Sequence, residues 1–477
     1  MGQEIAKSRF TTDDFAQFHH KLSIETQLLK QCIEQQACSN SSFVAGLELE
    51  AWLIDQYMRP SPINERYLLA LNDPLASAEL AKFNVELNTE PLALTGSMFA
   101  QLYQQLEQLW SDGQVHAHTH NAKMLMIGIL PTIKQSDLCL SNMSDLNRYR
   151  ALNEQILRSR GKPIHLEVTG VEHLELEHHD VMLESAATSL QLHTKVPLDL
   201  AHHYYNASII ASAPMVALCA NSPYLFGKNL WHESRIPLFE QAIETGGYAG
   251  VAHGPLRRVS FGTGYAKHSI FECFNENLEH FPVLLPAKLG PSSQKLDYLR
   301  LHNGTIWRWN RPLIGFDNDG TPHIRIEHRS PAAGPTVIDT IANTAFYYGL
   351  AKSICDELTQ TTIETPFSQA KDNFYQAARF GLEAHIHWNA QPSQRIYHLI
   401  ATQLIDRAIA GLQSYGIADS EITPLMSIIR DRVQNKQNGS VWQQRYIQQV
   451  KPDFTEMTQR YFFHQQSNIP VSQWNIQ

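Results

Sequence analysis

The sequence lacks most of the short motifs by which large enzymes are commonly recognised. It contains no GxxxxGK[ST] loop, no GxGxxG after a predicted strand, no GxSxG and no HExxH. P-loop, dinucleotide-binding, serine hydrolase and zincin architectures therefore have no local support. The six cysteines are scattered without a CxxC pair, which argues against a compact zinc or disulfide framework.

The sequence also lacks the charge and hydropathy patterns of nucleic-acid-binding and membrane proteins. No run of lysine and arginine occurs, and the formal net charge is -9 over 477 residues, so nucleic acid is not expected as a partner. The longest run of small apolar residues, 207–220, is shorter than the ~18 residues of a membrane span. We expect it to form a buried helix, and we expect no membrane partner. Residues 1–15 carry no apolar signal region, which favours a cytoplasmic location.

No internal repeat or low-complexity tract divides the chain. Helical spacing of apolar residues predicts helices at 13–37, at 98–110, from about 144, and at 337–358 after Pro335. Strands are predicted between them without a regular βαβ rhythm, which favours an α+β fold with a largely antiparallel sheet. We expect a catalytic core over residues 1–390 and a helical C-terminal extension, 391–477, packed on it. The Gly-rich passage 246–264 is suited to loops and to a mobile lid.

Three short segments carry charged or amide side chains at alternate positions of predicted strands. They are GLELEAWL from Gly46, KFNVELNTEPL from Lys82 and HIRIEHRSP from His323. Because successive strand side chains point to opposite faces, each segment has one apolar and one polar side. The residues that share the polar sides are Glu48 with Glu50, Glu86 with Asn88, and Arg325 with Glu327 and Arg329.

A solvent-exposed sheet face would explain such alternation without any function. However, Trp52 and Ile54 continue the polar side of the first strand, and the third strand mixes both signs of charge. Two converging carboxylates repel each other by ~4 kcal/mol at ~4 Å and an effective dielectric near ~20, so a cation should hold them together. Magnesium prefers oxygen ligands and is commonly shared between carboxylates and substrate phosphates. The pattern therefore predicts a nucleotide and metal site.

Histidine and arginine supply further candidates. The 23 histidines form clusters at VHAHTH, EHLELEHHD and HHYYN, for which surface exposure is the expected explanation. Gln191 and His193 differ, because they share one face of the strand predicted from Ser189. Arg235 is a candidate ligand for carboxylate or phosphate oxygens, with an ordinary salt bridge as its alternative role. For Arg311 the alternative is stacking on tryptophan.

These segments, together with ANSPYLFGKNLWHESR from Ala220, resemble the glutamate-cysteine ligase family, especially its plant-like and carboxylate-amine ligase branches. The resemblance spans roughly residues 44–390. It implies a glutamine-synthetase-like fold, in which a curved antiparallel β-sheet forms a funnel surrounded by helices. It also implies that the concave face binds two or three Mg²⁺ ions and ATP.

The resemblance also implies roles for individual residues. The implied metal ligands are Glu48, Glu50, Glu86, Glu327 and His193. The implied catalytic residues are Arg329 and Arg235, and the implied cofactor-binding residues are Arg325, Arg311, Gln191 and Arg148, the last within an Arg-Tyr pair. Which of Gln191 and His193 contacts metal or substrate stays open. Glu79 is a further acidic candidate, but its predicted helical context makes surface exposure equally expected.

The function implied by the resemblance is ATP-dependent amide bond formation through an acyl phosphate, with glutamate-cysteine ligation in glutathione biosynthesis as the best-known case. Its partners would be small amino-acid or carboxylate and amine substrates, with a homodimer as a candidate assembly. A second interpretation is a metal-dependent hydrolase that uses His193 with nearby carboxylates to bind Zn²⁺ or Mn²⁺. A third is a catalytically silent relative that binds nucleotide or amino acid.

Overall fold

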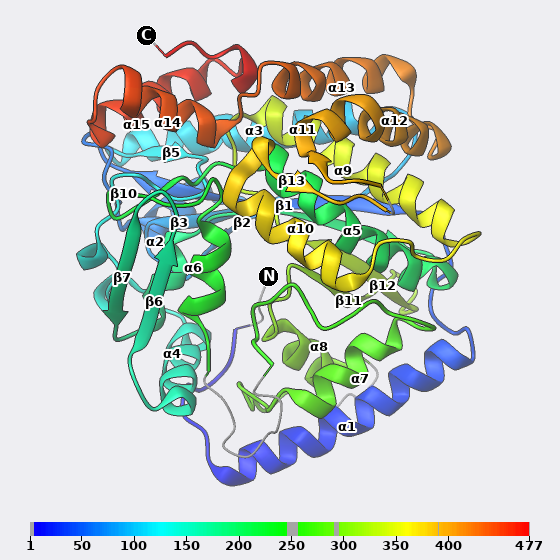
Figure 1. Ribbon diagram of the computed structural model, residues 1–477. Helices are drawn as coiled ribbons and strands as arrows, with labels where there is room; N and C mark the ends of the chain where they lie inside the picture. The colour runs from blue at the N-terminus through cyan, green and yellow to red at the C-terminus, as the bar shows by residue number, and fades with distance from the viewer. Residues whose placement is uncertain (1–3, 246–255, 291–294, 390, 477) are drawn as a thin grey trace.

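A curled antiparallel sheet forms the centre of the computed structural model, which describes residues 4–245, 256–290, 295–389 and 391–476 (Figure 1). The sheet has eight strands in the order β11-β12-β8-β1-β3-β2, with β4 and β5 also paired to β1. The strands are β1 (Val44–Ile54), β2 (Ala76–Ala78), β3 (Asn84–Asn88), β4 (Leu92–Ala93), β5 (Lys123–Leu125), β8 (Leu190–Val196), β11 (Asn310–Phe316) and β12 (Pro322–His328). Every pairing in this sheet is antiparallel. The expected α+β class and curved antiparallel sheet are confirmed.

The apolar side of the sheet packs on the long helix α5 (Ala201–Cys219). A second long helix, α9 (Val337–Leu358), packs on α5 and reaches the sheet through Tyr348, whose hydroxyl donates to the Gly46 carbonyl at 2.9 Å. In β1, Leu47, Leu49 and Ala51 alternate with the polar residues and are fully buried, as their spacing predicts. The α5 helix is apolar on all sides and buried along nearly its whole length, which is typical of a core helix. The polar side of the sheet is therefore the concave side, and it is free to form a site.

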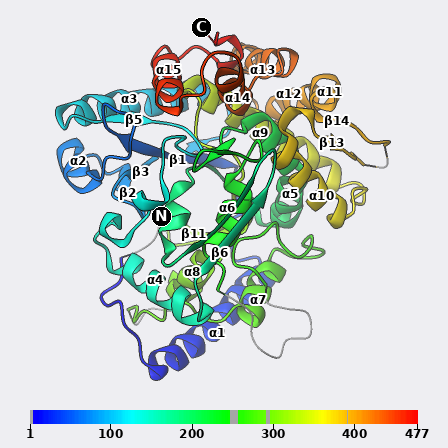
Figure 2. The same cartoon turned by 60° about the vertical axis from the view of Figure 1, so that its left-hand side comes forward.

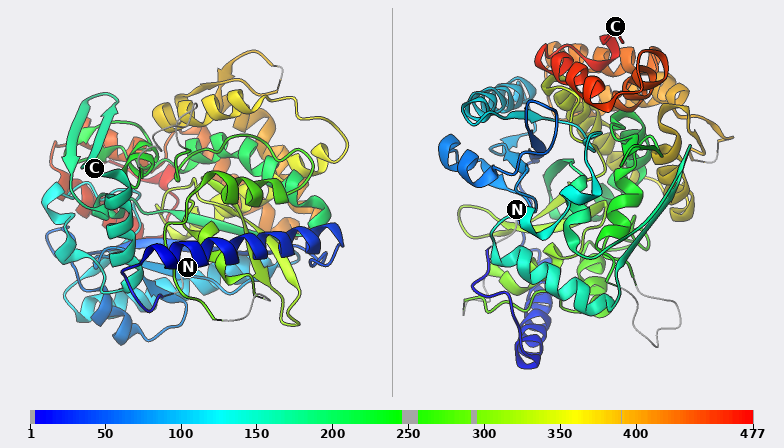
Figure 3. Two further views of the ribbon diagram at one scale, coloured as in Figure 1. Left: turned by 90° about the horizontal axis from the view of Figure 1, so that it is seen from below. Right: turned by 90° about the vertical axis from the view of Figure 1, so that its left-hand side faces the viewer.

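The concave side faces helices from the middle of the chain (Figure 2). These are α4 (Asn147–Arg160), α6 (Arg235–Ala242) and α8 (Asp297–Gly304), and the hairpin of β6 (Ile164–Thr169) and β7 (His173–His178) lies outside α6. The first helix, α1 (Thr12–Glu34), runs beneath α8 and α7 (Phe271–His280) (Figure 3). These helices close the open end of the curled sheet.

The last part of the chain forms a helical layer over α9 (Figure 1). Its main helices are α12 (Ile405–Ser414), α13 (Asp419–Gln434), α14 (Gly439–Gln449) and α15 (Phe454–Gln466). Arg432 of α13 is fully buried and pairs with Asp339 of α9 at 2.7 Å. Loss of one partner of a buried ion pair strongly destabilises the folded protein. This contact therefore ties the C-terminal layer to the core.

Most predicted elements are present, with two differences. The strand predicted from Lys123 contains only the three residues of β5, because the chain leaves the sheet edge after Leu125. Residues 246–255 of the Gly-rich passage lie outside the described residues, so the lid expected there stays a prediction. The cysteines are free. No described helix has the length and hydropathy required to cross a bilayer.

Candidate active site

The strand register brings the polar residues of five strands into one band on the concave face. Paired residues of neighbouring strands point to the same side of a sheet. The paired positions are Glu50 with Glu86, Glu48 with Gln191, His193 with Glu327, and Glu327 with Arg311. The segments that the sequence analysis selected separately therefore form one continuous surface.

Glu48, His193 and Glu327 form a first group of potential metal ligands. All three are buried, and their ligand atoms lie within 4.8 Å of one another. The Nε2 atom of His193 is 3.1 Å from the Glu48 carboxylate and 3.8 Å from that of Glu327. Burial alone would raise the pKa of Glu48, but the imidazole of His193 outweighs it and lowers the pKa to about 2. Glu48 is therefore an anion at neutral pH.

Glu50, Glu79 and Glu86 form a second group, again with ligand atoms within 4.8 Å of one another. Burial, with a further contribution from Glu86, raises the pKa of Glu50 to about 7 against the opposing charge of Arg329. Burial and the neighbouring Glu86 and Glu50 also raise the pKa of Glu79 well above its ordinary value. The second group is thus a cluster of carboxylates whose ionised forms repel one another.

The position of Glu79 corrects the sequence-based expectation. Its predicted helical context is wrong, because Glu79 directly follows the short strand β2 and lies outside any helix. This strand pairs with β3 and places Glu79 beside Glu86. The residue is half-buried at the site and is not a helix-surface residue.

The two groups have the properties expected of cation sites. In the first, one carboxylate oxygen of Glu48 and the Nδ1 atom of His193 are buried without a hydrogen-bond partner among the described residues. In the second, three carboxylates converge, and a divalent cation would offset their repulsion. The donor sets, mostly carboxylate oxygen, fit Mg²⁺. Glu48 and Glu50 fall into different groups, as side chains two residues apart on a strand allow.

Gln191 and His193 have distinct surroundings. Gln191 donates a hydrogen bond to Glu50 at 3.0 Å and accepts one from Arg329 at 2.7 Å. His193 instead lies between Glu48 and Glu327. Of the two, His193 has the position of a metal ligand and Gln191 that of a link between a carboxylate and an arginine.

The arginines of the site are held by specific partners. Arg311 forms an ion pair with Glu327, and the Arg329 guanidinium lies 3.4 Å from the same carboxylate. Burial alone would raise the pKa of Glu327, but these two guanidinium groups outweigh it and lower the pKa. Arg235 pairs with Glu233 at 2.8 Å and donates to the Ser330 carbonyl at 2.7 Å. Arg235 therefore has the salt bridge of its alternative role and also lines the site.

A cavity of about 310 Å³ lies between the concave face and α4 and α8. Its volume is in the range of small-molecule sites. The polar lining combines carboxylates with five arginines: Glu50, Glu79, Glu184, Arg148, Arg300, Arg311, Arg325 and Arg329. Leu152, Ile243, Leu285 and Trp307 add an apolar part. Arg148 stacks over Tyr149 at 4.7 Å, so the Arg-Tyr pair belongs to the cavity wall.

A second, small cavity of about 20 Å³ adjoins the first. Its polar lining comes from Glu50, Glu184, Ser189, Arg235 and Arg329, and Phe239 and Trp309 form its aromatic part. Burial and the neighbouring Glu50 raise the pKa of Glu184 to about 8 against the charge of Arg329. The sequence analysis missed Glu184 and Arg300, because they lie on a 3₁₀ turn and on α8, outside any alternating strand pattern.

The histidine clusters do not contribute to either ligand group. Within the described residues, the groups that could share an ion contain His193 as their single histidine. His116 and His118 lie in α3 (Met98–Thr119), and His173 is exposed on β7. The expected surface exposure holds for His118 and His173, but it is wrong for His178, which is buried and lies 2.8 Å from the Asp180 carboxylate.

Comparisons with known proteins were made for sequence and for fold. The family profile described as Glutamate-cysteine ligase family 2 (GCS2) matches residues 44–452, and no curated protein sequence matches the chain. The fold is similar to the crystal structure of glutamate–cysteine ligase from Francisella tularensis in complex with AMP, with 12% identity, a TM-score of 0.54, and 91% of this chain and 90% of that chain covered. It is also similar to a bifunctional glutathione synthetase from Pasteurella multocida, with 11% identity, a TM-score of 0.56, and 94% and 54% covered. This chain thus spans about half of the latter protein.

Proposed function

The chain belongs to glutamate-cysteine ligase family 2, and from this premise we propose that it is an ATP- and magnesium-dependent ligase that joins a carboxylate to an amine. One observation carries the proposal. Two three-ligand groups, Glu48 with His193 and Glu327, and Glu50 with Glu79 and Glu86, lie on one sheet face beside a cavity lined by arginines. This arrangement suits phosphoryl transfer from a metal-bound nucleotide.

The proposed reaction has two steps. An oxygen of the carboxylate substrate attacks the γ-phosphorus of ATP, and ADP leaves, which gives an acyl phosphate. The amine nitrogen then forms a bond to the acyl carbon, phosphate leaves with the electron pair of the broken C–O bond, and the nitrogen loses a proton. Positioning and charge neutralisation supply most of the catalysis in such transfers.

The two ligand groups would hold magnesium, with Glu79 added to the ligands predicted from sequence. When bound, Mg²⁺ neutralises charge on phosphate oxygens and orients them. The chain itself would bind the rest of the nucleotide in the 310 Å³ cavity. Its apolar part would hold the base, and Arg148, Arg311 and Arg325, which line the same cavity, would face the phosphates.

Arg329 and Arg235 are the proposed catalytic arginines. Gln191 and Glu327 orient Arg329, while Glu233 and the Ser330 carbonyl orient Arg235. Their guanidinium groups are thus fixed before substrate binds, which lowers the reorganisation needed when charge develops on the transferred phosphoryl group. This arrangement supports a role in transition-state stabilisation.

A metal-dependent hydrolase is the second candidate, and one observation favours it. The Glu48, His193 and Glu327 group has the nitrogen and oxygen donors that Zn²⁺ accepts. Metal analysis of the purified protein separates the two functions. Retained zinc with Mg-independent turnover supports the hydrolase, whereas exchangeable magnesium supports the ligase.

The test of the proposal is a screen for ADP release. The protein is incubated with Mg-ATP and pairwise mixtures of amino acids, starting with L-glutamate and L-cysteine, and the products are identified by mass spectrometry. The ligase predicts ADP and a condensed product for at least one pair, and neither product without Mg²⁺. Silence across the screen would contradict turnover and support a nucleotide- or amino-acid-binding relative.

A further inference from the structure

We propose that Glu184 binds the nitrogen of the amine substrate, and that the small cavity beside it is the amine subsite. This inference rests on the proposed function, because an amine is a substrate only if the protein is a ligase. Glu184 belongs to neither metal-ligand group. It is, however, shared by the small cavity and the 310 Å³ cavity.

The size of the small cavity restricts its occupant. A volume of about 20 Å³ holds roughly one water-sized group. A single amino group fits this space. The remainder of an amine substrate would extend into the adjoining 310 Å³ cavity, since Glu50, Glu184 and Arg329 line both.

The charges around the small cavity also favour an amine over a metal ion. Arg235 and Arg329 line it together with Glu50 and Glu184, so the two guanidinium groups offset the two carboxylates and the small cavity lacks the excess negative charge that a bare divalent cation needs. A neutral amine is the nucleophilic form and is not repelled in this way. The aromatic rings of Phe239 and Trp309, whose centroids are 5.8 Å apart, provide the apolar part of the wall.

The Glu184 carboxylate is available for such a ligand. Within the described part of the chain, no group donates a hydrogen bond to it or forms an ion pair with it. A carboxyl group in a half-buried position normally acquires partners. An N–H of the substrate would supply one, which makes Glu184 the acceptor that faces the acyl phosphate held by Arg329.

The backbone that carries Glu184 is fixed. It lies in the 3₁₀ turn Val181–Ala186, whose other residues are buried. Asp180 caps this turn by accepting the Met182 N–H at 3.0 Å, and Asn153 of α4 accepts the Val181 N–H at 3.1 Å. The side chain is therefore presented from a rigid segment, as a binding site requires.

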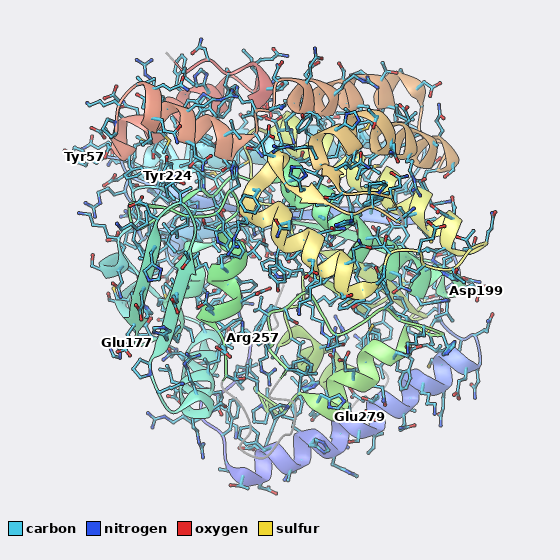
Figure 4. The ribbon with its side chains drawn as sticks, viewed as in Figure 1. Tyr57, Glu177, Asp199, Tyr224, Arg257 and Glu279 are labelled. Atoms are coloured by element: carbon cyan, nitrogen blue, oxygen red, sulfur yellow. The ribbon has the colours of Figure 1, made fainter. Side chains whose placement is uncertain are left out.

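The test separates amine binding from the first chemical step. Wild-type, Glu184→Gln and Glu177→Gln proteins are compared, because Glu177 is an exposed glutamate on β7 at the outer side of the molecule (Figure 4). The first measurement uses ATP labelled with a heavy isotope at the oxygen that bridges its β- and γ-phosphorus atoms. With Mg²⁺ and the carboxylate but no amine, movement of this label to a non-bridging position of ATP reports reversible formation of the acyl phosphate. The second is amide formation at varied concentrations of hydroxylamine, a minimal amine.

At pH 9, above the raised pKa of Glu184, we expect Glu184→Gln to retain isotope exchange within twofold and to raise the KM for hydroxylamine about 5-fold, because an amide oxygen accepts a weaker hydrogen bond than a carboxylate. Glu177→Gln should match the wild type. Loss of isotope exchange in Glu184→Gln, or loss of the rise in Tm on addition of Mg²⁺, would overturn the inference. Either result would mean that Glu184 binds the metal or the phosphate. An unchanged KM would also overturn it. A wild type that shows no exchange with any carboxylate would instead refute the proposed function and the subsite with it.

Discussion

The substitution Glu50→Gln should stabilise the metal-free protein while it weakens the response to magnesium. Glu50 lies against Glu79 and Glu86, and burial with Glu86 raises its pKa to about 7 from an ordinary value of 4.5. Because the folded-state pKa is raised, the contribution of the Glu50 carboxyl group to the free energy of unfolding is fully present below pH 4.5 and is lost as the pH rises through 7. At about 1.4 kcal/mol per pH unit, the charged form costs roughly 3 kcal/mol at pH 8.

Glutamine keeps the shape of the side chain and an oxygen to accept the Ser189 N–H, now at 2.6 Å. Since Glu50 is half-buried, we expect a gain of about 2 to 3 kcal/mol. An unfolding entropy of about 2.1 cal/mol/K per residue gives roughly 1 kcal/mol per degree for this chain. Thermal unfolding at pH 8 in EDTA should therefore show the Tm of Glu50→Gln about 2 to 3 °C above wild type.

Addition of excess Mg²⁺ should raise the Tm of the wild type more than that of Glu50→Gln, in which only the group of Glu48, His193 and Glu327 stays complete. Binding to the folded state alone stabilises it by mass action, and the variant lacks one ligand. Glu177→Gln serves as the control and should respond like the wild type. A Tm of Glu50→Gln below that of the wild type in EDTA would refute the repulsion among the carboxylates. An equal rise in Tm with Mg²⁺ in both proteins would refute Glu50 as a ligand of the cation.

Three other substitutions follow from the same structure. Glu79→Gln should lower kcat at least ~100-fold through loss of transition-state charge stabilisation, and near-normal Mg-dependent ADP release would rule out Glu79 as a ligand. Arg432→Met leaves the buried Asp339 carboxylate without a cation, so the free energy of unfolding measured with denaturant should fall by about 3 to 5 kcal/mol, and an unchanged denaturation midpoint would contradict a stabilising role of the pair. Burial lowers the pKa of His328 to about 3 from 6.5, so its stability contribution is lost as the pH falls below 6.5. Between pH 7 and pH 5, the free energy of unfolding measured with denaturant should fall by about 2 kcal/mol less in His328→Asn than in the wild type. An equal fall in both proteins would contradict this expectation.

The sequence predicted those parts of the site that depend on local pattern. Glu48, Glu50 and Glu327 lie on strands with strict alternation, and the alternation alone determines which face they share. The register between strands was not predictable, because it depends on packing over long sequence separations. Glu79 and Glu184 were missed or misplaced, since a three-residue strand and a 3₁₀ turn leave no periodic signal.

The fold was predictable for a similar reason. The helix predicted at 13–37 buries one stripe of its surface, and it is present as Thr12–Glu34. The helix predicted at 337–358 is buried on nearly all faces, and it is present as Val337–Leu358. Both kinds of burial leave a clear apolar pattern in the sequence. The strand from Lys123 was predicted too long because a buried apolar run does not distinguish a strand from a buried loop. Residues 126–130 are such a run, buried outside any strand.

The central claim is that this chain activates a carboxylate as an acyl phosphate on the concave face of its sheet. The most direct test uses a carboxylate substrate whose oxygens carry a heavy isotope, together with Mg-ATP and the amine partner found in the screen. The account predicts one labelled oxygen in each inorganic phosphate released, with one ADP per amide bond. Unlabelled phosphate, or release of AMP in place of ADP, would contradict it.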